Sequence, residues 1–188
     1  MPAPRERRPA GRGDVGWAAA PPGPVRVVPY VRGRREHRDA YRALNLAWIE
    51  AHFTIEARDR RELDDPEGHI LAAGGHILMA EADGPGGVEI LGTCALLVEP
   101  DGAFELAKMA VREAARGRGV GRALGTAAIH TARAAGAPRV DLLSNTVLGP
   151  AISLYRALGF VEVPLPATDY ARANIKMVLD LTTLPVAP

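Results

Sequence analysis

The sequence predicts a mixed α/β fold in which helices flank a central, mostly antiparallel sheet. Three strand-like segments follow one another with only short turns between them, which is typical of an antiparallel meander. A glycine-rich turn then opens a long helix with one apolar face. Because this helix runs between two strand-like segments, those two strands are expected to be parallel neighbours in the sheet.

A strand and two helical segments open the predicted domain. Val25 starts the strand, and apolar side chains recur at helical spacing from Arg34 to Phe53. A further helical turn covers Arg58 to Leu63 and stops before Pro66. We expect the segment from Trp48 to Glu67 to cover one side of the sheet. It is the natural place for substrate-selecting groups, because it belongs neither to the core strands nor to the glycine-rich turn.

The meander occupies the middle of the chain. Its first two strands are joined by the loose hairpin turn Gly84-Pro85-Gly86-Gly87, and the third follows the turn Pro100-Asp101-Gly102. The three predicted strands are His76–Glu81, Val88–Val98 and Phe104–Val111.

The long helix after the glycine-rich turn reaches about Ala135, and Gly136 caps its end. The later elements end the domain with a strand, a compact helix bracketed by proline and glycine, and two more strands. They are predicted at Arg139–Ser144, Pro150–Leu158, Phe160–Val163 and Asn174–Leu181.

The glycine-rich turn predicts a binding site for a diphosphate. A helix start leaves backbone N–H groups without intrahelical partners, and the helix dipole favours an anion beside them. Glycines let the backbone bend tightly and let a ligand approach. Arginines at a helix start gain nothing from the dipole unless a polyanion binds there. The turn reads Arg116-Gly117-Arg118-Gly119-Val120-Gly121-Arg122.

The spacing of the glycines narrows the kind of diphosphate. The dinucleotide pattern G-x-G-x-x-G requires a third glycine where this chain has Arg122 or Leu124. A P-loop requires Gly-Lys, which does not occur in the chain. The pattern that fits is Arg116-x-x-Gly119-x-Gly121, which resembles the coenzyme A pyrophosphate loop of the GNAT superfamily of N-acetyltransferases.

A second motif strengthens this resemblance. Asn145 is followed by Ala151-Ile152-Ser153-Leu154-Tyr155-Arg156-Ala157-Leu158-Gly159-Phe160, which is similar to the family's Asn…A-x-x-L-Y-x-x-x-G-F signature. The element order also resembles that of the family, over roughly Val25 to Leu181. The resemblance implies a sheet that splays between the strand ending at Val111 and the strand Val140–Ser144.

The resemblance further implies acetyl-CoA as cosubstrate. In the family, the pantetheine arm enters the splay and pairs with backbone groups at the positions of Met109 and Val111, and Asn145 contacts the arm from the neighbouring strand. The residues expected to contact coenzyme A are Met109, Ala110, Val111, Arg116, Gly117, Arg118, Gly119, Val120, Gly121, Arg122 and Asn145.

Acyl transfer to an amine needs a proton acceptor, a donor for the oxyanion and a proton source for the departing thiolate. The resemblance implies that Tyr155 is the general acid, since a phenol with a pKa of about 10 stays protonated at neutral pH. The spacing is equally consistent with an aromatic side chain that packs on the inward helix face. The backbone N–H of Val111, or one near it, is the expected oxyanion donor.

Glu105 is the candidate base, because histone acetyltransferases of the superfamily carry a catalytic glutamate at the same offset from the loop. The alternatives are an exposed carboxylate at the end of a strand and ordered water acting as the base. Lys108 lies in the same strand, and we expect its side chain on the opposite face from Glu105, with its stem packed at the surface.

The acceptor is the least specified part of the prediction. Glu56 and Asp59 could attract a cationic amine, and Tyr170 or Asn174 could line the same pocket, but we expect each to be an ordinary surface residue. We predict an N-acetyltransferase that acts on a primary amine, a small or amino-acid-like molecule, through a ternary complex. The alternatives are a non-catalytic acyl-CoA sensor or scaffold and an enzyme that uses a longer acyl chain.

Composition excludes several other classes. The net charge of +1 argues against a nucleic-acid binder with a strong basic field. Cys94 is the only cysteine, so neither an intrachain disulfide nor a cysteine zinc site is expected, and the histidines lack close metal-ligand spacing. No apolar run approaches the roughly 20 residues of a membrane span, and no secretory signal is visible. A cytoplasmic location is the default.

The predicted domain covers residues 25–182. Residues 1–24 are rich in Pro, Gly, Ala and Arg with little to bury, and are expected to form a disordered tail. Residues 183–188 form a C-terminal tail. The family often forms homodimers, and a homodimer is therefore possible here.

Overall fold

The computed structural model describes residues 23–167 and 170–182, so nearly all of the predicted N-terminal tail and the whole of the C-terminal tail lie outside it. The strands are β1 (Arg26–Pro29), β2 (His76–Gly84), β3 (Gly87–Val98), β4 (Phe104–Val111), β5 (Arg139–Ser144), β6 (Val161–Val163) and β7 (Ile175–Asp180). The helices are α1 (Arg35–His52), α2 (Ala57–Asp64), α3 (Val120–Ala134) and α4 (Gly149–Ala157), with short helical turns η1 (Glu67–Leu71) and η2 (Glu113–Ala115).

The seven strands form one sheet in the order β1-β2-β3-β4-β5-β7-β6. β2, β3 and β4 are the antiparallel meander that the sequence predicts, and β4 and β5 are the parallel neighbours that flank the crossover helix α3. All other pairs are antiparallel. The mixed α/β prediction is therefore confirmed. The π-helical turn η1 after Pro66 is an element that the sequence pattern does not predict.

The sheet opens between β4 and β5. These strands pair only through Phe104 with Val140 and Glu105 with Asp141. Beyond those pairs β5 continues alongside β7 as far as Ser144, while β4 runs on to Val111 beside β3 alone. This divergence is the splay that the family resemblance implies, and it leaves one edge of β4 without a strand partner.

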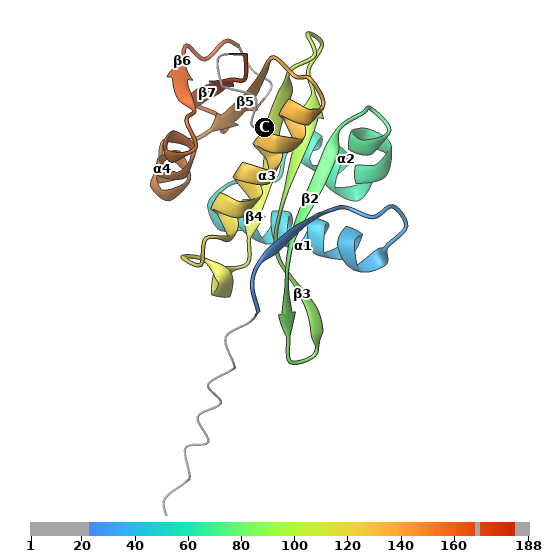
Figure 1. The fold of residues 1–188 in the computed structure, drawn as a ribbon. Helices are drawn as coiled ribbons and strands as arrows, with labels where there is room; N and C mark the ends of the chain where they lie inside the picture. Colours follow the sequence, from blue (N-terminus) through green and yellow to red (C-terminus); the bar gives the residue numbers. More distant parts are fainter. Residues whose placement is uncertain (1–22, 168–169, 183–188) are drawn as a thin grey trace, which may run out of the picture.

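Helices cover both faces of the sheet (Figure 1). Leu124 and Ala128 of α3 belong to the buried core cluster on one face. Tyr41 and Ile49 of α1 and Leu63 of α2 belong to the cluster on the other face. The apolar stripes of these amphipathic helices thus account for the two layers of core. Within the described ranges, no helix is long and apolar enough to cross a membrane.

One glycine fixes how closely α3 approaches the sheet. A Cβ at Gly92 would lie 2.9 Å from the carbonyl oxygen of Ala110 and 3.1 Å from side-chain atoms of Val120 and Leu124. Gly92→Ala is therefore expected to destabilise the protein by about 1–3 kcal/mol through overpacking. Chemical denaturation of both proteins measures the change. Gly86→Ala is the control, since nothing lies within 4 Å of its added Cβ, and equal losses from both variants would contradict the packing argument.

Candidate active site

A cavity of about 450 Å³ lies at the mouth of the splay. Its walls come from β4, the glycine-rich turn, the start of α3, the end of β5, α4 and the cavity-facing side of α1. Most of the predicted site residues line it together, although Ala110 and Arg118 do not. Those that do are Glu105, Met109, Val111, Arg116, Gly117, Gly119, Val120, Gly121, Arg122, Asn145 and Tyr155.

The glycine-rich turn has the backbone geometry of an anion site. Gly117 and Gly119 have φ values of 75° and 78°, in the left-handed region that glycine alone adopts without strain. The bond from the Ala123 N–H to the Gly119 carbonyl, at 2.9 Å, is the first of the helical ladder. The N–H groups of Val120, Gly121 and Arg122 therefore lack helical acceptors at the positive end of the α3 dipole.

The three arginines of this turn are exposed. No ion pair joins Arg116, Arg118 or Arg122 to an acid within the part of the chain that the structure describes. Their charge is therefore available to a ligand, whereas most arginines elsewhere in the described chain pair with carboxylates. An uncompensated cluster of cations at a helix start favours a bound polyanion.

The open edge of β4 presents backbone groups to the cavity. The N–H of Arg112, the residue after β4, donates to the carbonyl of Leu91 in β3 at 2.8 Å. Because hydrogen-bonded and non-hydrogen-bonded pairs alternate along an antiparallel ladder, the backbone groups of Val111 point away from β3 and into the splay. This is the position expected for a donor to the oxyanion or to a pantetheine amide.

Tyr155 projects from α4 into the same cavity. Its ring meets Phe160 edge-on, with 6.0 Å between centroids and an interplanar angle of 62°. No hydrogen bond joins its hydroxyl to any described residue, so the O–H is free for a ligand. Burial raises the pKa of Tyr155 to about 12, which keeps the hydroxyl protonated throughout the neutral range.

Glu105 lies at the base of the splay and is 6% exposed, so the alternative of an exposed strand-end carboxylate is wrong. Its Oε2 accepts a hydrogen bond from Nη2 of Arg58 in α2 at 2.7 Å. The other carboxylate oxygen has no partner among the described residues. The candidate base is thus held in place by an ion pair and retains one oxygen that can accept a proton.

The prediction for Lys108 is wrong. A bulge in β4 sets Lys108 and Met109 together opposite Cys94, and Lys108 has a φ of 52°. Since a bulge shifts the alternation of side chains by one residue, Lys108 turns to the same side of the sheet as Glu105. Its ammonium is buried and lies 2.8 Å from Asp59 and 2.7 Å from Glu62.

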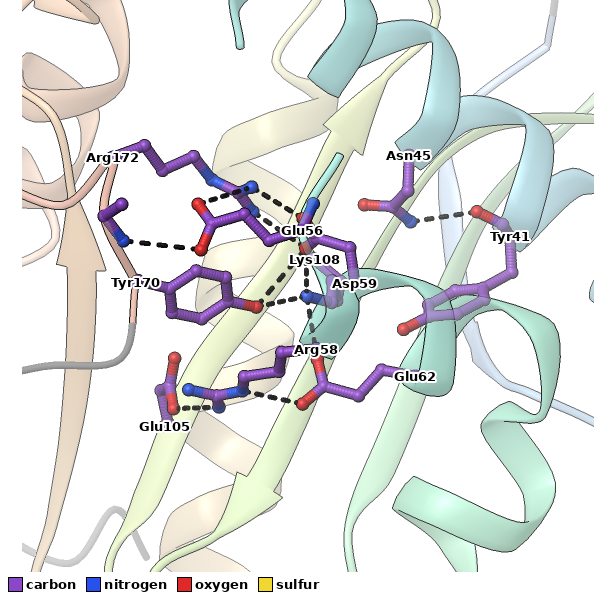
Figure 2. A network of polar contacts seen from close by, with 11 residues as sticks. Tyr41, Asn45, Glu56, Arg58, Asp59, Glu62, Glu105, Lys108, Tyr170 and Arg172 are labelled. Carbon is purple, nitrogen blue, oxygen red and sulfur yellow. Dashed lines mark hydrogen bonds and ion pairs between the residues drawn. The ribbon is translucent and has the colours of Figure 1, made fainter. Parts of the chain in front are cut away.

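Lys108 is one member of a buried ionic network that ties α2 to β4 and to the segment before β7 (Figure 2). Arg172 donates to both oxygens of Asp59, at 2.6 and 2.8 Å. The hydroxyl of Tyr170 accepts a 2.5 Å hydrogen bond from Lys108. Asp59 is 0% and Tyr170 6% exposed, so the expectation that they are surface residues is wrong.

The network fixes the charge states of its members. Burial alone would raise the pKa of Asp59, but the hydrogen bonds from Arg172 and Lys108 reverse this and hold it well below its usual value. Burial would lower the pKa of Lys108, and its neighbours Tyr170 and Glu62, together with the bond to Asp59, instead leave it raised. Both groups are therefore ionised at neutral pH, and Lys108 is not available as a base.

The remaining candidates have structural partners. Asn145 donates to the Arg172 carbonyl at 2.7 Å and accepts from the N–H of Val147 at 3.0 Å, so its amide ties the end of β5 to the segment before β7. Asn174 is exposed and bonds Thr146. Glu56 accepts from Arg172 at 3.4 Å. Cys94 is fully buried, and burial raises its pKa to about 12.

Comparisons with known proteins find a family model that matches part of this chain. Residues 73–162 match the model of the acetyltransferase (GNAT) domain. By this match, residues 73–162 have the sequence pattern of a GNAT domain. That match runs from before β2 into β6 and so includes the splay, the glycine-rich turn and Tyr155. A search among curated proteins finds no match by sequence.

Solved structures share the GNAT fold of this chain. A GNAT-family acetyltransferase from Staphylococcus aureus Mu50 superimposes with a TM-score of 0.72 at 21% identity, covering 84% of this chain and 99% of that one. The Bacillus subtilis acetyltransferase in complex with CoA has a TM-score of 0.62 at 20% identity, over 84% and 99% of the two chains. Salmonella typhimurium yncA with its cofactor acetyl-CoA has a TM-score of 0.62 at 18% identity, over 86% and 96%.

The sequence pattern does not predict the ionic network of this site. One signal was present: Asp59 and Glu62 are three residues apart, and so share one face of a short helix. Lys108 was a second, since it is one of two lysines in the chain and interrupts an apolar strand. Neither signal identifies the residues with which these side chains pair, because the network joins segments about 50 and 110 residues apart in the chain.

Proposed function

We propose that this protein transfers an acetyl group from acetyl-CoA to a primary amine on a small or amino-acid-like molecule. The observation that carries the proposal is one cavity that joins a cation-rich helix start, the open edge of β4 and the unpartnered hydroxyl of Tyr155. Structures of the same fold that hold CoA or acetyl-CoA support the choice of cosubstrate.

In the proposed complex, the backbone N–H groups at the start of α3 and the arginines of the turn hold the pyrophosphate. The pantetheine arm lies along the open edge of β4 and bonds backbone groups at Met109 and Val111. The thioester carbonyl then lies near the N–H of Val111, which stabilises the oxyanion. Asn145 positions the segment before β7 at the rim of the site.

The reaction follows as a direct transfer in a ternary complex. The neutral amine nitrogen attacks the thioester carbon and forms a C–N bond, and its proton passes to Glu105 directly or through water. The tetrahedral intermediate collapses as the C–S bond breaks. The departing thiolate takes the proton of Tyr155, which later regains one from solvent. The products are an amide and CoA.

The proposed function is tested by titrating acetyl-CoA calorimetrically and by assaying thiol release across a panel of amines. Binding together with amine-dependent thiol release supports the transferase. Binding without release from any amine favours a non-catalytic acyl-CoA sensor. A protein that fails to bind acetyl-CoA has neither function.

The arginines of the turn carry a separate prediction. Arg116→Ala is expected to weaken acetyl-CoA binding about tenfold, because one charge-assisted contact to a phosphate contributes roughly 1.5–3 kcal/mol before solvent screening reduces it. The difference between the two proteins should shrink as salt is added, since Arg116 is exposed. Calorimetry at low and high salt measures both effects. Arg60→Ala, an exposed arginine of α2, is the control, and an equal loss there would contradict a role specific to the turn.

A further inference from the structure

Asn45 occupies an unfavourable place for its residue type. It lies in the interior of α1, where asparagine is a poor helix former, and it is 2% exposed. A buried side-chain amide costs free energy unless its polar atoms have hydrogen-bond partners. Packing alone therefore does not explain why asparagine occupies this position.

The orientation of the amide follows from one contact. Nδ2 of Asn45 lies 2.9 Å from the carbonyl oxygen of Tyr41, one turn earlier in α1. A carbonyl oxygen can only accept, so the amide nitrogen must face Tyr41 and Oδ1 must face the other way. Figure 2 shows this oxygen turned away from Tyr41. Asn45 lines the cavity, and no described residue donates a hydrogen bond to Oδ1.

The cavity wall around Oδ1 is apolar and aromatic. Trp48 and Ile49 follow Asn45 on the same face of α1, and Phe53 continues the wall beyond the helix end. The charged groups nearby are already paired: Lys108 with Asp59 and Glu62, and Arg172 with Asp59 and Glu56. Near Oδ1 the cavity therefore offers an acceptor atom that no described residue bonds, and the cations around it are already paired with carboxylates.

We propose that Oδ1 of Asn45 accepts a hydrogen bond from the acceptor amine, and that the acceptor is an amine on an uncharged apolar or aromatic skeleton. This inference rests on the proposed function and narrows its substrate class. An acceptor atom at this place engages an N–H of the amine and leaves the nitrogen lone pair free for the thioester. The side chains of Trp48, Ile49 and Phe53 then pack against the carbon skeleton, while a carboxylate on that skeleton would find no free cation.

The first test compares probe amines on the wild-type protein. 2-Phenylethylamine is expected to show a kcat/KM at least tenfold above that of phenylalanine, which adds a carboxylate, and of putrescine, which has a second ammonium group and no ring to pack against the apolar wall. A preference for phenylalanine or putrescine overturns the substrate class.

The second test replaces Asn45 with leucine, which has a similar shape and no polar atoms. Asn45→Leu is expected to raise KM for 2-phenylethylamine about tenfold, the effect of one lost hydrogen bond, with the affinity for acetyl-CoA unchanged. A merely structural role for Asn45 would instead leave the amine KM unchanged, or would weaken acetyl-CoA binding and lower the melting temperature in step with it. Either result overturns the inference. Ala47→Leu, at an exposed position of α1, is the control for the added bulk.

A binding measurement separates this inference from the proposed function. 2-Phenylethylamine is titrated calorimetrically into the wild type and Asn45→Leu, both saturated with CoA. Weaker binding to the variant supports the amine site even if no thiol is released in the assay, which would overturn only the transferase. Absence of binding to the wild type, or equal binding to both proteins, overturns the amine site.

Discussion

Replacing Tyr155 with phenylalanine is expected to slow acetyl transfer by about a hundredfold or more, within the range of 10²–10⁴ typical of a general acid, and to leave the affinity for acetyl-CoA unchanged. The substitution removes one oxygen atom and keeps the edge-on contact with Phe160. Because no described residue bonds the Tyr155 hydroxyl, its loss leaves no protein group unpaired. Initial rates of thiol release and calorimetric titration of acetyl-CoA measure the two quantities.

The raised pKa of Tyr155 adds a test in pH. Since burial raises that pKa to about 12, the hydroxyl stays protonated on the alkaline side, and its ionisation should not reduce the wild-type rate between about pH 8 and 10. Phe160→Leu serves as the packing control, because it alters the surroundings of the ring and keeps the hydroxyl. If Tyr155→Phe turns over at the wild-type rate, the tyrosine is a packing residue and the thiolate takes its proton from water.

Asp59→Asn is expected to lower the free energy of unfolding by about 3–5 kcal/mol, because it leaves the buried Lys108 and the partly buried Arg172 without their shared anion. Lys108 and Arg172 both bond Asp59, and neither Glu62 nor Glu56 can replace a carboxylate that meets both. For a domain of this size the melting temperature should fall by roughly 6–20 °C. Thermal and chemical denaturation measure the loss.

The pH dependence of this effect follows from the direction of the Asp59 pKa. A folded-state pKa below the unfolded value of about 3.9 means that the carboxylate stabilises the protein above that pH. The contribution is lost as the pH falls from about 4 toward the lower folded value, so the two proteins should converge in acid. Asp64→Asn is the control, since that carboxylate is half exposed, and a loss as large as that of Asp59→Asn would show that the network is not special.

The sequence predicts the frame of this site better than its acceptor side. The bounds of β4 and β5 match the predicted ranges Phe104–Val111 and Arg139–Ser144. Hydrophobic periodicity and the glycine and proline signals are local, so they locate elements well. The glycine-rich turn is predictable for the same reason. Glycine adopts left-handed φ values without strain, so the residue type alone indicates the backbone conformation found at Gly117 and Gly119.

The acceptor side depends on contacts that no local signal contains. The bulge at Lys108 inverts the alternation that period-two reasoning assumes, and this one change moves an expected surface lysine into the core. The partners of Lys108 in α2 and at Tyr170 then follow from tertiary packing alone. Asn45 could not be predicted as a site residue for a related reason. The sequence does not show that its amide is buried or that it has a single hydrogen-bond partner.

The small number of residue pairs that join β4 to β5, which is two, also affects the local unfolding of the sheet. The unit formed by β5, β7 and β6 shares only that short seam of ladder hydrogen bonds with the rest of the sheet, so its amide protons are expected to exchange with solvent at a lower opening free energy than those of β2 and β3. A ligand that forms hydrogen bonds with both β4 and β5 would take the place of a strand between them. Occupancy would then add backbone hydrogen bonds between the two parts of the sheet, and protection of β5 would report binding without any assay of chemistry.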